Sequence, residues 1–300
     1  MLAIVIPYYK ISFFEATLQS LEYQTDKRFK VYIGDDNSSE NPTCLLKKYE
    51  GKFDFQYHKF NENLGGTSLV KHWERCIDLA ETQSWIMILG DDDYLDETVI
   101  DSWYKQYNNF NRKANVIRFA SRVVDEKLQT ISGLYTHNVL EKPSDSYYNR
   151  FKGYTRSSLS EHVFLKQAYQ KYRFTDYPVA WHSDDKAWLD FSEDKPIYSI
   201  NESAVFIRMS AINISGKKEY DVVKNDATSK FLKDVLRQKL NDFNKAQRLE
   251  LMLYFEEVTK RTRKLSSAEW RLILKLYFIN FKFVPFFKSW RRLFITIVSK

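Results

Sequence analysis

Three consecutive aspartates, residues 91–93, follow the apolar run Trp85–Leu89 and Gly90. Adjacent carboxylates repel one another, so a divalent cation would stabilise such a cluster. Mg²⁺ and Mn²⁺ prefer oxygen ligands and bind readily together with phosphates. The alternative is a solvated acidic turn in which Asp96 caps the next helix. From this segment alone the two interpretations are equally good.

Two further polar clusters also follow apolar runs. Residues 8–10 (Tyr-Tyr-Lys) come after Leu2–Pro7, and residues 35–37 (Asp-Asp-Asn) come after Phe29–Gly34. In an open α/β sheet, ligands bind beyond the carboxyl ends of the strands. Three clusters at one edge indicate a single pocket with a stacking aromatic ring, a carboxylate for base or ribose, and a carboxylate for metal. That combination suits a nucleoside diphosphate.

Two common nucleotide-binding motifs are missing. The Gly65-Gly66 pair lacks the Lys-Ser/Thr of a P-loop, and no G-x-G-x-x-G follows the first apolar run. ATPase and ordinary dinucleotide-binding functions are therefore disfavoured.

Strand-like and helix-like segments alternate four times. Strands are expected at Leu2–Pro7, Phe29–Gly34, Phe53–His58, Trp85–Leu89 and Asn115–Phe119, and helices from Ser12 (with Glu15 as a capping box), from Asn41, over 67–80 and after Asp96. This alternation predicts an α/β fold with a mostly parallel central sheet flanked by helices. Residues 143–160 lack clear periodicity and are expected to form a mobile loop region.

Length and composition limit the remaining possibilities. A chain of 300 residues has room for one large domain, or for one domain and an appendage. Cys44 and Cys76 match no metal-ligand spacing and indicate a reducing compartment. The first residues carry no basic leader, and no uncharged apolar run approaches the ~18 residues that cross a bilayer. A cytoplasmic protein without a membrane span is expected.

Charge is distributed unevenly along the chain. From residue 260 onward there are eleven Lys and Arg residues and one acidic residue, Glu269, which gives +10. Since the whole chain carries +7, residues 1–259 carry −3. This asymmetry indicates an anionic partner for the tail.

The tail lacks the alternation of strands and helices and instead has apolar residues at helical spacing. We therefore expect one domain over 1–220 and a basic, amphipathic helical region over 221–300. Its aromatic and aliphatic residues, interleaved with Lys and Arg, are typical of helices that lie on an anionic membrane without spanning it. Packing on the first domain or on a second subunit is the alternative. Nucleic acid is disfavoured because no fold motif supports it. We favour the membrane surface.

Four ordered motifs resemble those of the family-two glycosyltransferases of the GT-A fold. They are residues 4–9 (Ile-Val-Ile-Pro-Tyr-Tyr), 33–38 (Ile-Gly-Asp-Asp-Asn-Ser), 63–66 (Asn-Leu-Gly-Gly) and 89–95 (Leu-Gly-Asp-Asp-Asp-Tyr-Leu). They look like the family's opening strand, second-strand motif, N-x-G loop and D-x-D segment. The resemblance covers roughly residues 1–215 and implies a GT-A-like domain. One departure is Gly90, which stands where the first Asp of D-x-D is usual.

The resemblance implies roles for individual residues. Asp92 matches the metal-binding carboxylate and Asp93 a following acidic position, with Mn²⁺ or Mg²⁺ as the cofactor. The residues implied to bind the nucleotide are Pro7, Tyr9, Asp36 and Asp91. With this resemblance, a metal at Asp92 is strongly favoured over the solvated turn.

Residues 181–188 (Trp-His-Ser-Asp-Asp-Lys-Ala-Trp) resemble the family's E-D motif, which places Asp185 at the general-base position and leaves Asp184 as its rival. An ionised carboxylate there can take the proton of the attacking acceptor hydroxyl. Otherwise both aspartates merely start a helix, where the helix dipole favours them. His182 is interpreted as structural, because a lone histidine is more often structural than a ligand of a metal or a sugar.

Residues 204–216 look like the family's closing segment, in which an Arg or His faces the diphosphate. Here Arg208 either contacts phosphate or is a surface residue at a strand end, and these alternatives are equally good. Ser210 occupies the His position, so no metal or phosphate contact is expected from it.

The expected function is that of an inverting, metal-dependent glycosyltransferase. It would move a sugar from a nucleotide donor, with UDP expected because the family most often uses it, to a hydroxyl of a glycan or lipid-linked acceptor in surface polysaccharide synthesis. The expected location is the inner face of the cytoplasmic membrane. A nucleotidyltransferase is disfavoured because no Gly-rich basic loop lies near the first strand. A non-catalytic sugar-nucleotide-binding scaffold is suggested by Gly90, but Asp92 and Asp185 argue against it.

Overall fold

The computed structural model describes residues 1–210, 220–280 and 282–298. The chain forms two compact units. The first comprises Met1–Asp176 and Ser183–Lys217, and the second comprises Tyr177–His182 and Lys218–Lys300.

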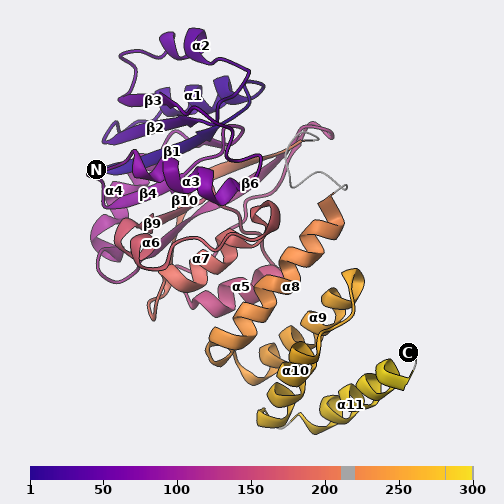
Figure 1. Ribbon diagram of the computed structural model, residues 1–300. Coiled ribbons are helices and arrows are strands. Elements are labelled where there is room, and N and C mark those ends of the chain that lie inside the picture. Colours follow the sequence, from indigo (N-terminus) through magenta and orange to yellow (C-terminus); the bar gives the residue numbers. More distant parts are fainter. Residues whose placement is uncertain (211–219, 281, 299–300) are drawn as a thin grey trace. The chain divides into compact units, whose positions relative to one another are not determined.

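The first unit is built on one mixed sheet with the strand order β3-β2-β1-β4-β9-β6-β10-β5 (Figure 1). Its strands are β1 Leu2–Tyr8, β2 Phe29–Asp35, β3 Phe55–Lys59, β4 Trp85–Ile88, β5 Tyr94–Leu95, β6 Val116–Asp125, β7 Thr130–Ile131, β8 Leu140–Glu141, β9 His162–Leu165 and β10 Ile197–Met209. β3, β2, β1 and β4 are parallel, as are β6 and β10, while β9 runs antiparallel to both β4 and β6. The predicted α/β fold with a mostly parallel sheet is confirmed.

Helices cover this sheet. They are α1 Phe14–Glu22, α2 Thr43–Lys47, α3 Leu69–Asp78, α4 Val99–Phe110, α5 Pro143–Phe151, α6 Lys166–Tyr172 and α7 Ser183–Phe191. α3 packs on β1 and β2, and α4 packs on β10. Every residue of β1 except Pro7 is buried, as expected for a parallel strand covered on both faces. The apolar runs that form β1 and β4 therefore lie at the centre of the core.

Two local expectations are wrong. The capping box at Ser12 and Glu15 does not form, because α1 begins after Phe13 without a side-chain cap and Glu15 pairs instead with Lys48 at 3.0 Å. Residues 143–160 are not a loop throughout, because α5 occupies Pro143–Phe151. The buried residues of α5 are Ser144, Ser146 and Tyr147, so its inner face shows no apolar period.

The second unit is helical. It contains the 3₁₀ turn η1 Pro178–Ala180, α8 Asp221–Gln238, the 3₁₀ turn η4 Leu240–Asp242, α9 Lys245–Thr262, α10 Ser267–Ile279 and α11 Phe283–Val298. Capping boxes begin α9, at Asn244 with Gln247, and α10, at Ser266 with Glu269. The predicted helical appendage is confirmed. Within the described ranges of the chain, no helix is both long enough and apolar enough to cross a bilayer.

Candidate functional site

The carboxyl ends of β1, β2 and β4 meet, as the sequence predicted. Asp91, after β4, accepts the backbone N–H groups of Tyr9 and Lys10 on one carboxylate oxygen, each at 2.8 Å. Ser38, after β2, donates its hydroxyl to the carbonyl of Tyr9 at 2.6 Å. Adjacent parallel strands place these groups at one edge. One polar site therefore collects residues that lie more than 80 positions apart in the chain.

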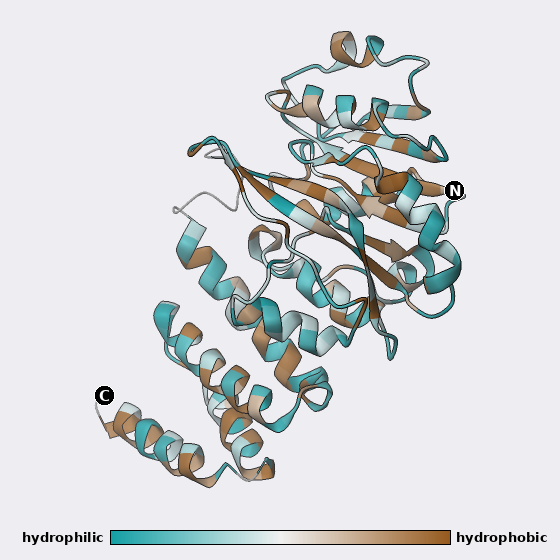
Figure 2. Ribbon diagram, turned by 180° about the vertical axis from the view of Figure 1, so that it is seen from behind, coloured by the Kyte–Doolittle hydropathy of each residue, from teal (hydrophilic) through white to brown (hydrophobic). Residues whose placement is uncertain are grey.

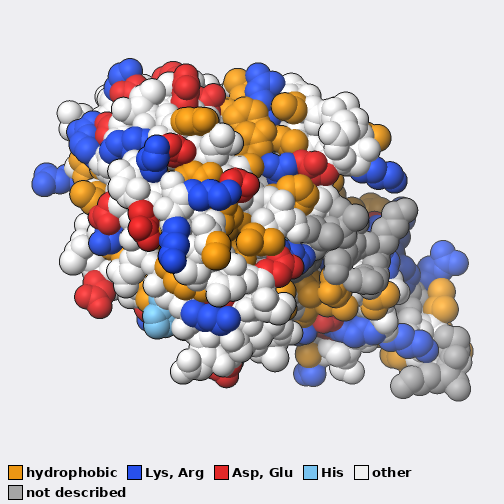
Figure 3. All heavy atoms as spheres, turned by 90° about the horizontal axis from the view of Figure 1, so that it is seen from above, with side chains coloured by type: hydrophobic (Ala, Val, Ile, Leu, Met, Phe, Trp, Pro, Cys, Tyr) orange, Lys and Arg blue, Asp and Glu red, His pale blue; other side chains and the backbone are white. Residues whose placement is uncertain are grey.

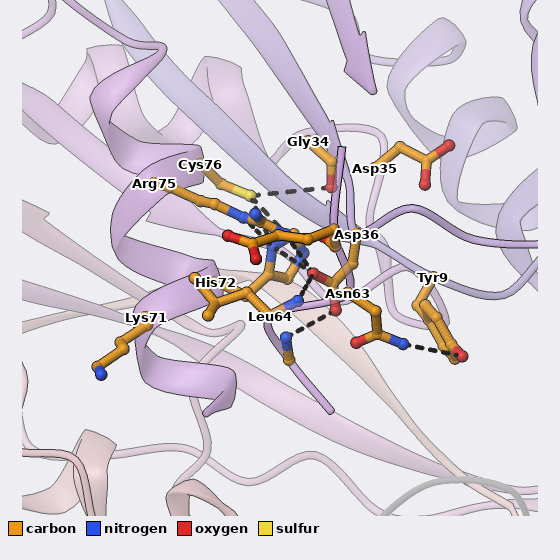
Figure 4. Close-up of polar contacts among 12 residues, drawn as sticks. Tyr9, Gly34, Asp35, Asp36, Asn63, Leu64, Lys71, His72, Arg75 and Cys76 are labelled. Atoms are coloured by element: carbon orange, nitrogen blue, oxygen red, sulfur yellow. Dashed lines mark hydrogen bonds and ion pairs between the residues drawn. The ribbon is translucent and has the colours of Figure 1, made fainter. Parts of the chain in front are cut away.

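Asp36 anchors the loop at residues 63–66 against the end of β2 (Figure 4). Its carboxylate accepts the N–H groups of Leu64 at 2.8 Å and Gly65 at 2.9 Å, and it pairs with Arg75. Burial raises the pKa of Asp36, whereas these N–H groups and Arg75 act in the opposite direction. The residue predicted to line a nucleobase pocket thus also fixes the loop beside it.

Two glycines of the site permit close approaches. A Cβ on Gly65 would lie 2.5 Å from Oδ2 of Asp36, so a side chain there would displace the carboxylate. A Cβ on Gly34 would lie 2.3 Å from Sγ of Cys76, which sets the close packing of α3 on β2. At both positions of these motifs, the neighbouring side chain leaves no room for a residue larger than glycine.

Tyr9 is the exposed aromatic side chain of this edge. Its residue is 43% exposed, and its hydroxyl accepts an N–H from the Asn63 amide at 3.2 Å (Figure 4). Pro7 is partly buried within β1, opposite Gly34 of β2. A ring with an accessible face can stack on a nucleobase, which is the role predicted for Tyr9.

The three aspartates have different surroundings. Asp93 accepts the N–H of Arg208 at 2.8 Å and the hydroxyl of Ser160 at 2.5 Å, whereas Asp92 is only partly buried. Burial together with the charge of Asp92 raises the pKa of Asp93 to about 8. The same two causes raise the pKa of Asp91 to about 7. The concentrated negative charge makes this turn attractive to a cation.

Gly90 fits this crowded turn. A Cβ at Gly90 would lie 2.9 Å from Oδ1 of Asp92 and 3.0 Å from Oδ2 of Asp93. The side chains of Asp92 and Asp93 thus occupy the space that an Asp at residue 90 would need. Within the described part of the chain, no three His, Cys, Asp or Glu side chains are arranged to hold a metal ion by themselves.

Arg208 holds the aspartate turn to β10. Its Nε donates to the carbonyl of Asp92 at 2.8 Å, and its guanidinium pairs with Glu126 and lies 4.4 Å from the ring centre of Phe13. The side chain is 9% exposed, so the interpretation as a surface residue at a strand end is wrong. Contact with a diphosphate stays a prediction.

Asp185 lies in the first turn of α7 and is 3% exposed. Its Oδ2 is 2.9 Å from a guanidinium nitrogen of Arg150 on α5, and both residues line a small pocket with Ser157 and Trp188. A neighbouring cation favours the ionised form of a carboxylate. The pair therefore places a cation beside the carboxyl group that is predicted to act as the general base.

Asp184 is arranged differently. Its Oδ1 accepts the backbone N–H of Asp185 at 2.9 Å. Burial, followed by the charge of Asp185, raises the pKa of Asp184 to about 7, while Arg150 opposes the shift. A buried carboxyl whose pKa is raised by its surroundings and by a neighbouring carboxylate is a feature of acid–base sites.

A short segment before β9 links the aspartate turn to α7. Ser160 donates to Asp93 and accepts the N–H of Gly90 at 3.1 Å. The adjacent Glu161 is fully buried, pairs with Arg156 at 3.1 Å, and its charge contributes to the raised pKa of Asp184. The sequence did not indicate a role in the site for three residues, Arg150, Ser160 and Glu161. They lie in or beside the stretch 143–160, which was expected to be a loop.

His182, interpreted as structural, lies in the second unit. Its Nε2 is 2.9 Å from the hydroxyl of Thr228, and its ring stacks on Phe231 with centroids 4.7 Å apart. Ser210 is at the edge of the described residues, and residues 211–216 of the predicted closing segment lie outside them.

Comparisons with known proteins bear on the family and the fold of the chain. The model of the family described as Glycosyl transferase family 2 matches residues 3–172. Among solved structures, S. aureus TarS 1-349 in complex with UDP-GlcNAc is similar, with 13% identity, a TM-score of 0.66, and coverage of 92% of this chain and 79% of that chain. TarS 1-349 in complex with UDP has 14% identity, a TM-score of 0.62, and coverage of 92% and 78%. No curated protein matches the chain.

At these identities the likeness to TarS establishes the fold alone. Together with the family match, it confirms the resemblance inferred from the four motifs and the GT-A-like architecture.

Proposed function

The chain belongs to glycosyl transferase family 2 and is a glycosyltransferase, and we propose that it moves a sugar from a UDP-sugar to a hydroxyl acceptor with inversion at the anomeric carbon. The main observation behind the proposal is that the Asp91 carboxylate accepts hydrogen bonds from the backbone N–H groups of Tyr9 and Lys10, each at 2.8 Å. It supports one pocket with an exposed ring on one side and an acidic turn on the other. The complexes of TarS with UDP-GlcNAc and UDP support UDP as the nucleotide.

The acidic turn fits a divalent cation. Asp92 and Asp93 are the proposed ligands, and their hard oxygen atoms suit Mn²⁺ or Mg²⁺. The raised pKa of Asp93 supports this, because it shows that a second negative charge in the turn is unfavourable unless a cation neutralises it. When bound, the metal would neutralise charge that develops on the departing diphosphate. Arg208, through its bond to the Asp92 carbonyl, would position the turn.

Asp185 is the proposed general base. Its carboxylate would take the proton of the acceptor hydroxyl as that oxygen attacks the anomeric carbon, and a single displacement of this kind inverts the configuration. The ion pair with Arg150 at 2.9 Å supports an ionised Asp185. Asp184 is the rival, since its pKa of about 7 also suits proton transfer near neutral pH.

The proposed acceptor is a glycan or a lipid-linked sugar in surface polysaccharide synthesis, and the proposed location is the cytoplasmic face of the membrane. The support comes from the basic tail, whose residues from 260 onward carry +10.

The test is release of the nucleotide from a panel of UDP-sugars, GDP-sugars and dTDP-sugars, with and without Mn²⁺ and with candidate glycan acceptors. We expect one UDP-sugar to be turned over in the presence of metal. Asp185→Asn should lower kcat about 100-fold or more, because general-base catalysis contributes that much, while leaving donor affinity unchanged.

Full turnover by Asp185→Asn would show that this residue is not the base. Consumption of a sugar phosphate and a nucleoside triphosphate, with release of pyrophosphate, would indicate a nucleotidyltransferase instead. A folded protein that binds donor but turns none over would favour a scaffold.

A further inference from the structure

Helix α11 turns large apolar side chains toward solvent. Phe283 is 47% exposed, Phe287 67%, Trp290 51% and Phe294 65%. These residues are spaced by four, three and four positions, so they form one stripe along the helix. Four aliphatic side chains of the same helix are also more than half exposed, namely Val284, Ile295, Ile297 and Val298. Figure 2 shows hydrophobic residues recurring along this helix.

The opposite face of α11 is held by polar contacts. Arg292 forms two hydrogen bonds with Glu256 of α9, at 2.6 and 2.7 Å, and the hydroxyl of the fully buried Ser289 lies 3.3 Å from the same carboxylate. Glu256 is 5% exposed. A bidentate pair of this kind has a defined geometry. A rotation of α11 that buried its aromatic stripe would break the pair between Arg292 and Glu256. The pair therefore keeps the apolar face of the helix exposed to solvent.

Helix α10 extends this surface. Phe278 is 60% exposed and its ring centre lies 5.9 Å from that of Phe286, while Ile279 is 54% exposed. Lys275 and Arg271 are exposed about one and two turns before them, respectively. We call the exposed side chains of residues 271–279 and 283–298 the tail surface.

The charge of the tail surface has one sign. Residues 264–298 contain seven Lys and Arg residues and a single acidic residue, Glu269. Glu269 is 2% exposed and pairs with Arg263 at 2.7 Å, so it offers no negative charge to a partner. Lys288 and Arg291 are exposed along the aromatic stripe of α11. On the face of the first unit in Figure 3, by contrast, basic and acidic side chains are interspersed.

We propose that the tail surface docks on an anionic lipid bilayer, with α11 lying in the plane of the interface. Phe287 and Phe294 would enter the boundary between headgroups and acyl chains, Trp290 would lie at headgroup depth, and Lys288 and Arg291 would contact lipid phosphates. This deepens the proposed membrane location by naming the surface that would make the contact, and vesicle binding tests it separately from sugar transfer.

The charge pattern favours lipid over a second copy of the chain. In a two-fold dimer the same surface meets itself, so Lys288 and Arg291 would face a surface that contains no acidic residue. An anionic bilayer supplies the missing charge and also covers the aromatic stripe.

The test is sedimentation of the full chain with vesicles of phosphatidylcholine alone or of equal parts phosphatidylcholine and phosphatidylglycerol. The paired substitutions Phe287→Ser and Phe294→Ser should weaken binding about 100-fold or more, because each buried phenylalanine contributes strongly to partitioning. Lys288→Glu with Arg291→Glu should weaken it on anionic vesicles by at least about fivefold per residue. The matched control is Leu128→Ser, a residue of the first unit that is 66% exposed and should not affect binding.

The proposal is supported if the wild type binds anionic vesicles more tightly than neutral ones and both tail variants lose binding while keeping wild-type circular dichroism. It is overturned if the wild type binds neither vesicle. It is also overturned if the Phe287→Ser, Phe294→Ser variant binds as the wild type does, or if sedimentation without lipid reveals a dimer that this variant abolishes.

Discussion

At the scale of single residues, the site depends on pairs of carboxylates that differ in their partners. Asp185 is paired with Arg150, whereas Asp184 accepts the backbone N–H of its neighbour and has a pKa of about 7. In the aspartate turn, Asp93 is tied to Ser160 and Arg208, while Asp92 is partly exposed. Burial and the charge of the neighbouring aspartate raise the pKa of Asp184 in the first pair and of Asp93 in the second, so one carboxylate of each pair titrates above its usual range.

Arg150 should set the pH dependence of the reaction. Removing its charge in Arg150→Met leaves the buried Asp185 without its cation, which raises the pKa of that carboxyl. The ionised base would then appear only at higher pH, so the acidic limb of the kcat/KM profile should move to higher pH. The conservative variant Arg150→Lys should shift the limb less. An unchanged profile in Arg150→Met would mean that the pair does not tune the base.

Gly65→Ala should disturb Asp36, since the added Cβ would lie 2.5 Å from its Oδ2. Overpacking of this kind costs about 1–3 kcal/mol of the free energy of unfolding, and nucleotide affinity should fall because the loop at 63–66 shifts. The control is Gly133→Ala, where a Cβ meets nothing within 4 Å. Urea unfolding and nucleotide titration measure both effects, and equal behaviour of the two variants would contradict this account.

Individual site residues could be predicted only in part. The motif aspartates and Tyr9 were identified from their positions after apolar runs, and they do lie together. Their partners were not identified, because Ser160 meets Asp93 across 67 positions and no local pattern marks such a contact. Arg208 shows the same limit, since its pair with Glu126 spans 82 positions.

At the scale of elements, strands were easier to predict than short polar helices. β1, β2 and β4 are nearly continuous apolar runs buried on both faces, which is a strong signal. α5 was missed because serine and tyrosine fill its buried face, although Pro143 and Asp145 in its first turn are ordinary helix-start signals. The helix carrying Arg150 is therefore recognisable by its start rather than by its periodicity.

The packing of β9 on α7 should make stability depend on pH. His162 at the start of β9 is buried, stacks on Trp188 with centroids 4.3 Å apart, and burial lowers its pKa from 6.5 to about 4. As the pH falls, the unfolded chain therefore binds this proton first. The stability that depends on a neutral His162 is complete above pH 6.5 and is lost as the pH approaches 4.

The variant His162→Phe keeps an aromatic ring against Trp188 but removes the titration. Between about pH 7.5 and pH 5, the wild type should lose about 2 kcal/mol more of its free energy of unfolding than the variant does. Urea unfolding at the two pH values measures this difference. Parallel losses in both proteins would show that His162 titrates normally in the folded state.

At the scale of the whole molecule, the chain combines two units of different character. The first presents the proposed nucleotide-sugar site at the edge of a mixed sheet, and the second presents a basic and aromatic surface on α10 and α11. The unequal charge, with +10 from residue 260 onward and −3 before it, was visible in the sequence. Which face of α11 points outward was not, because it is decided by the pair between Arg292 and Glu256 of another helix.

The central claim is that the edge of the sheet binds a nucleoside diphosphate with a divalent metal. The most direct measurement is calorimetric titration of the whole chain with UDP, GDP and dTDP, each with and without Mn²⁺. We predict that UDP binds, that Mn²⁺ strengthens its binding, and that Asp92→Ala abolishes this strengthening while the protein stays folded. Absence of binding by all three nucleotides to the folded protein, with or without Mn²⁺, would contradict the account.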